Sequence, residues 1–134
     1  MKIVYCCPGP DAGYEKIKRI IEMLVATDSF EVYRTLPEFE KYLRHDLTSG
    51  YLVILHASLQ EHLEHFVSLR DLLSGHKVIL ILPDRKRNTI ILGHTLRPRF
   101  LTYNDSDYLD VASVLCHIIN PQAGDVKLSP QGKM

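Results

Sequence analysis

The stretch Tyr51-Leu-Val-Ile-Leu-His-Ala57, followed at once by Ser58-Leu-Gln-Glu61, decides the fold of this chain. Its opening residues are apolar without interruption, which predicts a strand covered on both faces, as is typical of a parallel sheet. The serine and the glutamate that follow have the spacing of a capping box, which begins a helix by satisfying free backbone N–H groups. The stretch therefore predicts a strand, an abrupt turn and a helix. His56 would lie at the carboxyl end of the strand, where open α/β sheets hold their ligands.

The composition predicts one compact domain. The chain has 134 residues, of which 46% are hydrophobic, and its 16 basic side chains balance 16 acidic ones. A chain with a formal net charge of zero lacks the excess of basic residues that is typical of a nucleic-acid binder. We therefore expect no nucleic-acid partner. No apolar run approaches the roughly 18 residues of a membrane span, and the N-terminus enters a strand without a signal peptide. We therefore expect no membrane association.

The cysteines indicate the redox compartment. Cys6, Cys7 and Cys116 form an odd set. Neighbouring cysteines seldom bridge each other, and Cys116 falls inside a predicted helix. The set predicts a reduced, cytoplasmic protein.

The apolar pattern of the whole chain predicts alternating strands and helices. The predicted strands are residues 2–7, 30–34, 51–57, 77–83 and 100–103. Helices are predicted for residues 14–26, for a short segment opened by the capping box Thr35-Leu-Pro-Glu38, for residues 58–75 and for residues 105–119. Residues 84–97 are ambiguous, because a helix there would contain mediocre helix formers. Residues 1–120 are predicted to form the domain, and residues 121–134 a disordered tail, because the tail lacks apolar periodicity.

Four of the predicted helices carry apolar stripes that are expected to face the core, among them the helix of residues 58–75 and the last helix. The helix that follows the strand of residues 51–57 has a stripe of Leu59, Leu63, Phe66, Leu69 and Leu73. Gly75 is expected to stop that helix. The stripe of the last helix consists of Leu109, Ala112, Leu115 and Ile119.

The repeated strand–helix alternation predicts a single doubly wound α/β domain. Right-handed crossovers place helices on both faces of a parallel sheet and bury the third and fourth strands at its centre. The second strand is short and polar, which suits an edge. These features predict the strand order 2-1-3-4-5.

The order, lengths and strand apolarity of residues 1–120 resemble the receiver domain of bacterial two-component response regulators, which has the flavodoxin-like fold. Receivers carry, at the ends of successive strands, an acidic pair, a phospho-accepting aspartate, a threonine or serine, and a lysine followed by proline. This chain has at those positions Cys7-Pro8, His56, Leu82 or Pro83, and Tyr103-Asn104. Every catalytic position thus departs from the family.

The resemblance therefore implies a pseudo-receiver, a non-catalytic module for signalling and protein interaction. Aspartyl phosphorylation needs a carboxylate nucleophile and Mg²⁺, which prefers oxygen ligands, and cysteine and histidine are poor substitutes. Asp11 and Asp84 are the nearest acids, and neither lies at a family position. We expect no phosphotransfer, no metal site and no other cofactor. The emptied pocket would consist of Cys7, Pro8, His56, Leu82 and Tyr103.

The resemblance also implies a partner surface. In receivers the fourth helix, the fifth strand and the fifth helix commonly form the dimer or partner face. By position this surface corresponds here to His94, Arg97, Tyr103 and Tyr108. A protein partner or a homodimer is expected there.

A second hypothesis is a small cysteine-dependent transferase or redox protein. Cys7 ends the first strand before a Gly-rich loop and a helix, and a helix N-terminus lowers the pKa of a thiol. The layout resembles the phosphocysteine loop of sugar-phosphotransferase IIB domains, with His56 as a possible base. The spacing of tyrosine phosphatases fails, since Gly13 stands where an arginine is required. The Gly9–Gly13 loop also departs from the P-loop pattern, so a tight turn explains it better.

Three further features allow a functional interpretation, for which the sequence offers weaker support. His62 and His65 lack the spacings of zincin metal sites and are expected to be solvated. Arg85-Lys-Arg87, with Arg97 and Arg99, would form either one basic patch for an anionic partner or a solvated loop. The tail after Pro121 is compatible with a linker to an output domain.

Overall fold

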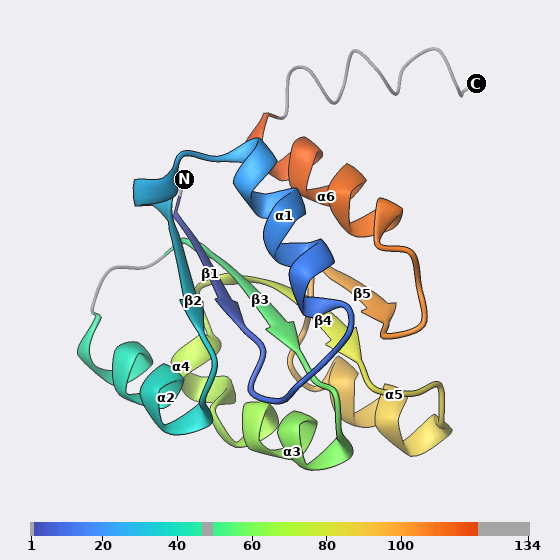
Figure 1. Ribbon diagram of the computed structural model, residues 1–134. Helices are drawn as coiled ribbons and strands as arrows, with labels where there is room; N and C mark the ends of the chain where they lie inside the picture. The colour runs from blue at the N-terminus through green and yellow to red at the C-terminus, as the bar shows by residue number, and fades with distance from the viewer. Residues whose placement is uncertain (1, 47–49, 121–134) are drawn as a thin grey trace.

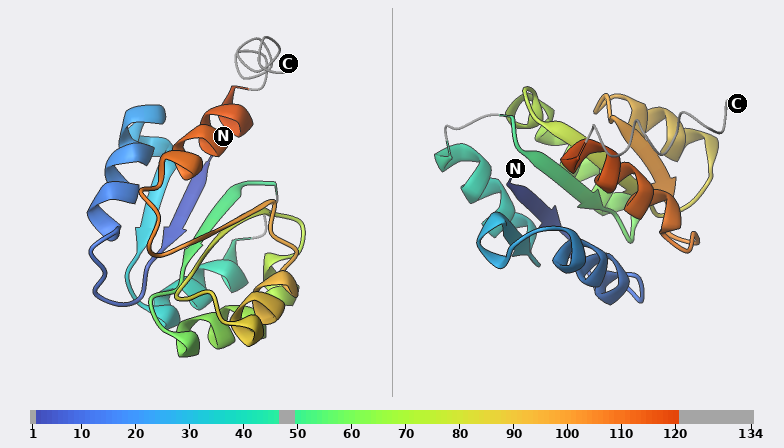
Figure 2. Two further views of the ribbon diagram at one scale, coloured as in Figure 1. Left: turned by 90° about the vertical axis from the view of Figure 1, so that its right-hand side faces the viewer. Right: turned by 90° about the horizontal axis from the view of Figure 1, so that it is seen from above.

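The computed structural model describes residues 2–46 and 50–120. They form an all-parallel sheet of five strands in the order β2-β1-β3-β4-β5, with helices on both faces (Figures 1 and 2). The predicted α/β class and strand order are confirmed, and the topology is flavodoxin-like.

The strands agree closely with the sequence prediction. They are β1 (Ile3–Cys6), β2 (Phe30–Tyr33), β3 (Leu52–His56), β4 (Lys77–Leu82) and β5 (Phe100–Tyr103). The helices are α1 (Tyr14–Leu24), α2 (Leu36–His45), α3 (Gln60–Ser68), α4 (Arg70–Leu73), α5 (Arg87–His94) and α6 (Leu109–Ile119), with a short 3-10 turn, η1 (Thr27–Ser29), before β2.

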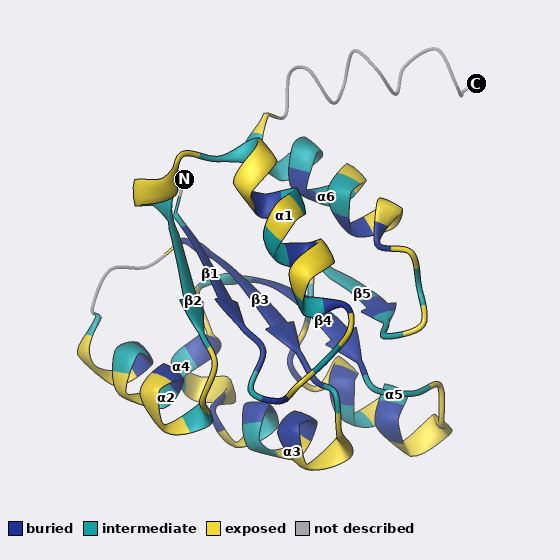
Figure 3. Cartoon of the chain, in the orientation of Figure 1, coloured by how far each residue is buried: buried dark blue, intermediate teal, exposed yellow. Residues whose placement is uncertain are grey.

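Two apolar layers enclose the sheet. Helices α1 and α6 cover one face, and α2, α3, α4 and α5 cover the other (Figure 1). Strands β1 and β3 are buried along their whole lengths, and β4 is buried after its first residue, whereas β2 and β5 form the half-buried edges (Figure 3). Because parallel strands covered on both faces need apolar side chains throughout, the uninterrupted apolar run of β3 lies at the centre of the sheet.

The helix after β3 differs from the prediction at its start. Thr35 does cap α2, since its Oγ1 accepts a hydrogen bond from the backbone N–H of Glu38. The corresponding prediction for Ser58 is wrong. Helix α3 begins at Gln60 with Leu59 as its N-cap, and the Leu59 side chain, predicted to be buried, is 53% exposed.

The same helix is also interrupted. The single helix predicted for residues 58–75 consists of α3 and α4, joined at Leu69, whose backbone leaves helical geometry at φ −98 and ψ 11. The other members of the predicted stripe are buried. After α4, Gly75 adopts a φ of 93, a left-handed conformation that favours glycine, and this turn leads into β4.

The ambiguous residues 84–97 contain α5. Gly93 explains why this helix packs closely on the sheet, since a Cβ there would lie 3.0 Å from side-chain atoms of both Leu80 and Leu82. The last helix begins later than predicted, because Tyr108 precedes it in the left-handed conformation with a φ of 65. Leu109, predicted to be buried, is consequently 69% exposed.

The predicted disordered tail, residues 121–134, lies outside the described residues. In the part of the chain that the structure describes, no helix has the length and apolar character that a membrane span requires.

Candidate functional site

The candidate site lies where the direction of the chain winding reverses. After β1 the chain crosses to α1 on one face of the sheet, whereas after β3 it crosses to α3 on the other face. The two loops separate at the carboxyl ends of these adjacent strands, which is where open α/β sheets form ligand crevices. A pocket of about 650 Å³ opens there, lined by residues 8–13, 58, 59, 62 and 104.

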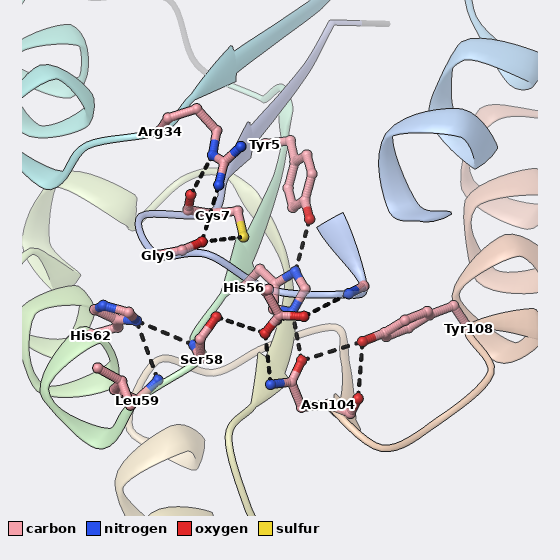
Figure 4. A network of polar contacts seen from close by, with 12 residues as sticks. Tyr5, Cys7, Gly9, Arg34, His56, Ser58, Leu59, His62, Asn104 and Tyr108 are labelled. Carbon is pink, nitrogen blue, oxygen red and sulfur yellow. Dashed lines mark hydrogen bonds and ion pairs between the residues drawn. The ribbon is translucent and has the colours of Figure 1, made fainter. Parts of the chain in front are cut away.

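His56 forms the buried base of this site. Its side chain has no exposed area, and both of its ring nitrogens are hydrogen bonded (Figure 4). Nδ1 lies 2.8 Å from the Tyr5 hydroxyl, and Nε2 lies 2.6 Å from Oδ1 of Asn104. The prediction that His56 ends the strand at this rim is confirmed.

The contacts of Asn104 define the protonation of the ring. Its Nδ2 donates to Oδ2 of Asp11 at 2.8 Å, so its Oδ1 accepts from His56. Nε2 of His56 therefore carries the proton, and Nδ1 accepts from the Tyr5 hydroxyl. Burial lowers the pKa of His56 and outweighs the hydrogen bond to Asn104 and the nearby charge of Asp11, both of which favour protonation. The ring is neutral at neutral pH.

Asp11 connects the loop after β1 to the ends of β3 and β5. Its Oδ2 accepts from the Ser58 hydroxyl at 2.7 Å and from Asn104, and its Oδ1 accepts from the backbone N–H of Gly13 at 2.7 Å. Burial alone would raise the pKa of Asp11, but the hydrogen bonds from Ser58, Gly13 and Asn104 outweigh it and lower the pKa. The carboxylate is therefore charged although its side chain is only 7% exposed.

Tyr108 closes the network from the start of α6. Its hydroxyl donates to the backbone oxygen of Asn104 at 3.0 Å and lies 3.2 Å from Oδ1 of the same residue. Burial raises the pKa of Tyr108 to about 12, so the hydroxyl stays a donor. The prediction that Tyr108 belongs to the partner face is wrong. The left-handed backbone at this position turns the ring into the molecule (Figure 4), and the residue is 2% exposed.

Cys7 lies beneath the loop and away from the pocket opening. Its side chain is buried in the layer under α1 and α6, and its Sγ donates to the backbone oxygen of Gly9 at 3.6 Å. Burial raises the pKa of the Cys7 thiol, against the smaller effects of Tyr5 and Arg34. The prediction that a helix N-terminus lowers the pKa of the Cys7 thiol is wrong, because the thiol belongs to the core layer and α1 begins only at Tyr14.

Arg34 fixes the backbone of the loop. Its Nε donates to the carbonyl of Cys7 at 2.8 Å, and one of its terminal nitrogens donates to the carbonyl of Gly9 at 3.0 Å. The guanidinium also lies 3.7 Å from the centre of the Tyr14 ring. These contacts hold the loop in place over the end of β1.

His62 is part of the site, contrary to the prediction that it is solvated. Its ring is buried, and Nδ1 accepts the backbone N–H groups of Ser58 and Leu59, each at 3.2 Å (Figure 4). The imidazole thus supplies the cap that the Leu59 side chain lacks. Burial lowers the pKa of His62, so the ring stays neutral and its free nitrogen, Nε2, carries the proton. His65 is half-buried, and its Nε2 lies 3.4 Å from Oε1 of Glu40.

The residues predicted to line the emptied receiver pocket lie on opposite faces of the sheet. Pro8 lines the opening, and Cys7 and His56 lie beneath it. Leu82 and Tyr103 instead pack into the layer under α2, α3, α4 and α5. Within the described ranges, His, Cys, Asp and Glu side chains do not gather in groups of three or more that could hold a metal ion.

The residues of the possible basic patch are divided, which excludes one continuous patch and agrees with the alternative of solvated loops. Arg85-Lys-Arg87 follows the carboxyl end of β4, whereas Arg97 and Arg99 precede the amino end of β5, at the opposite end of the sheet. Parallel pairing of β4 with β5 requires this separation, because the chain must cross back along α5 between the two strands. Arg85 is paired with Asp105 at 2.9 Å.

Sequence reasoning placed the rim correctly but missed most of its hydrogen-bonding partners. Tyr5 lies inside a strand and looks like an ordinary core residue. Ser58 has the spacing of a helix cap, and Asn104 stands where the receiver family has a proline. The one available signal was that Asp11, Ser58 and Asn104 all follow strands whose carboxyl ends meet at the same edge.

Comparison of the chain with protein-family models, with curated proteins and with solved structures finds no match in any of the three.

Proposed function

We propose that this protein is a non-catalytic, receiver-like module for signalling that acts by binding a protein partner or a second copy of itself. The observation that carries this proposal is the state of His56. It stands at the end of β3, where receivers hold their phosphoacceptor, and it is fully buried with both ring nitrogens hydrogen bonded. A group in this state cannot approach a phosphodonor without disrupting the network.

Asp11 does not replace the missing phosphoacceptor. Its oxygens accept hydrogen bonds from Ser58, Asn104 and Gly13, which stabilise the carboxylate and reduce its nucleophilicity. Cys7, the candidate of the enzyme hypothesis, is buried with a raised pKa, which disfavours the reactive thiolate. The polar groups of the site thus support a structural role better than a chemical one.

The proposed contact surface is the face formed by α5, β5 and α6. Strand β5 is an edge of the sheet, and its outer side leaves backbone groups available to a partner. His94 and Arg97, which the resemblance assigns to the partner face, are exposed, and Tyr103 is half-buried beneath the guanidinium of Arg85. Ile91 and Leu109 add exposed apolar area, at 55% and 69% exposure. A stable dimer needs about 800 Å² from each partner.

Sedimentation velocity across a range of protein concentrations tests self-association. The expected result is a dimer that Ile91→Glu abolishes, because a buried carboxylate without a partner opposes association. Met23→Glu is the matched control, since Met23 is 79% exposed on α1, outside the proposed face, and this variant should still form the dimer. A wild-type protein that stays monomeric at millimolar concentration refutes the homodimer and leaves a different protein as the partner.

Incubation with Mg²⁺ and a small phosphodonor such as phosphoramidate tests the non-catalytic part of the proposal. Mass spectrometry should detect no phosphoryl adduct on the folded protein. An adduct on His56, Asp11 or Cys7 would contradict it.

A further inference from the structure

The pocket between the loop after β1 and the start of α3 has the size of a small-molecule site. Its volume of about 650 Å³ falls within the range of roughly 300–1,000 Å³ typical of ligand pockets. It lies at the point where the winding of the chain reverses, which is a preferred location for such sites in this type of sheet. Position and size therefore agree on a binding role.

The walls of this pocket are apolar. Pro8, Pro10, Ala12 and Leu59 supply its apolar lining, and its polar side chains are those of Asp11, Ser58, His62 and Asn104. Apolar walls with a few fixed polar groups are the usual arrangement for binding a compact organic molecule.

Leu59 is at a position where helix stability alone would favour another residue. N-cap positions prefer Ser, Thr, Asp or Asn, whose side chains accept a backbone N–H, and leucine does not. The Leu59 side chain also remains 53% exposed, so it contributes little to the core. A residue that serves neither the cap nor the core, yet lines a pocket, suggests a role in the pocket.

Among the residues that line the pocket, Asp11 is the charged one, and the guanidinium of Arg34 is bound to the carbonyl groups of Cys7 and Gly9 in the same loop. Asp11 is ionised, and the groups that donate to it, from Ser58, Asn104 and Gly13, are all neutral. His56, whose Nε2 lies 3.4 Å from Oδ2 of Asp11, is neutral as well. Among the residues that line the pocket there is no lysine or arginine. The carboxylate therefore attracts a positive charge into the pocket.

We propose that this pocket binds a small organic cation, an amine or amidine carried on a compact apolar body. The cationic head would approach Asp11, whose Oδ1 accepts only one hydrogen bond within the network and has a second lone pair. The body would pack between the two prolines and Leu59. The ligand experiment reads binding at the pocket and the dimer experiment reads the oligomeric state, so the two succeed or fail separately.

Three probes of the same shape and different charge test the proposal: benzamidine, benzamide and benzoate. Each is titrated into ¹⁵N-labelled wild-type protein, and the amide shifts of residues 9, 11–13, 58, 59 and 104 are followed. Benzamidine is expected to bind in the millimolar range and about tenfold more tightly than benzamide, with benzoate the weakest. Absence of benzamidine binding, or tighter binding of benzoate, would overturn the proposal. The latter result would mean that the start of α3 attracts anions instead.

Two variants separate binding from folding. Asp11→Asn removes the charge and should reduce the preference for benzamidine over benzamide to about twofold or less. Leu59→Ser should weaken benzamidine about fivefold while the midpoint of thermal unfolding stays the same or rises, because serine is the better N-cap. Met23→Ser, at an exposed apolar residue of α1 outside both the pocket and the proposed contact surface, is the matched control and should bind benzamidine normally. Unchanged binding in Leu59→Ser would show that the probe lies elsewhere.

Discussion

Substitution of Gly13 by alanine should destabilise the protein for a steric reason alone. Gly13 has a φ of −78 and a ψ of −12, a conformation that alanine adopts freely. A Cβ there, however, would lie 2.7 Å from Cζ and 2.8 Å from Cε2 of Tyr108, and closer still to the hydroxyl oxygen. Glycine is therefore required by the approach of the Tyr108 ring and by no property of the backbone.

The magnitude follows from how firmly that ring is held. Tyr108 is buried, and its hydroxyl is hydrogen bonded to Asn104, so the ring cannot move without losing these contacts. Overpacking of a well-packed site costs about 1–3 kcal/mol, and each lost hydrogen bond costs about 0.5–1.5 kcal/mol more. Gly13→Ala should therefore lower the free energy of unfolding by about 2–4 kcal/mol.

A double-mutant cycle, measured by urea unfolding, isolates this contact. Tyr108→Leu destabilises the protein by itself, but in that background Gly13→Ala should cost less than about 0.5 kcal/mol, because the ring is gone. Gly75→Ala is the control. Gly75→Ala should lower the free energy of unfolding by about 1–2 kcal/mol, because Gly75 has a φ of 93. No atom lies within 4 Å of the added Cβ, so this cost should be the same in both backgrounds. Equal costs of Gly13→Ala in the two backgrounds would refute the steric argument.

The remaining predictions concern the buried titratable groups. Burial lowers the pKa values of His56, of His62 and of the half-buried His76, which precedes β4, so below pH of about 6.5 the unfolded chain binds protons more strongly than the folded one. The free energy of unfolding should therefore fall as the pH is lowered from 7.5 to 5 in urea titrations, and a constant or rising value would contradict the burial of these rings. His62→Ala should lower it by about 1–3 kcal/mol at pH 7.5, because two backbone N–H groups at the start of α3 lose their acceptor; an unchanged urea midpoint would exclude that cap. A charged alkylating reagent should label the half-buried Cys116 well before Cys7, as read by mass spectrometry, and rapid labelling of Cys7 would favour the enzyme hypothesis.

The sequence alone determined the strands, their order and the position of the rim. The short apolar runs of β3 and β4, bounded by turn residues, predict strands covered on both faces, and the handedness of crossovers then leaves few strand orders. His56 could be placed at the rim for the same reason. These features depend on the local pattern and on rules that hold for every α/β sheet.

The tertiary structure alone decided what the rim residues do. Asp11 and Asn104 are far apart in the sequence, and their hydrogen bond exists because β1 and β5 both end at the same edge of the sheet. The inward turn of Tyr108 and the capping of α3 by His62 depend on a left-handed backbone position and on a ring orientation. Neither leaves a periodic signal in the sequence, since a single side-chain direction is set by packing, whereas periodicity records only which face of an element is buried.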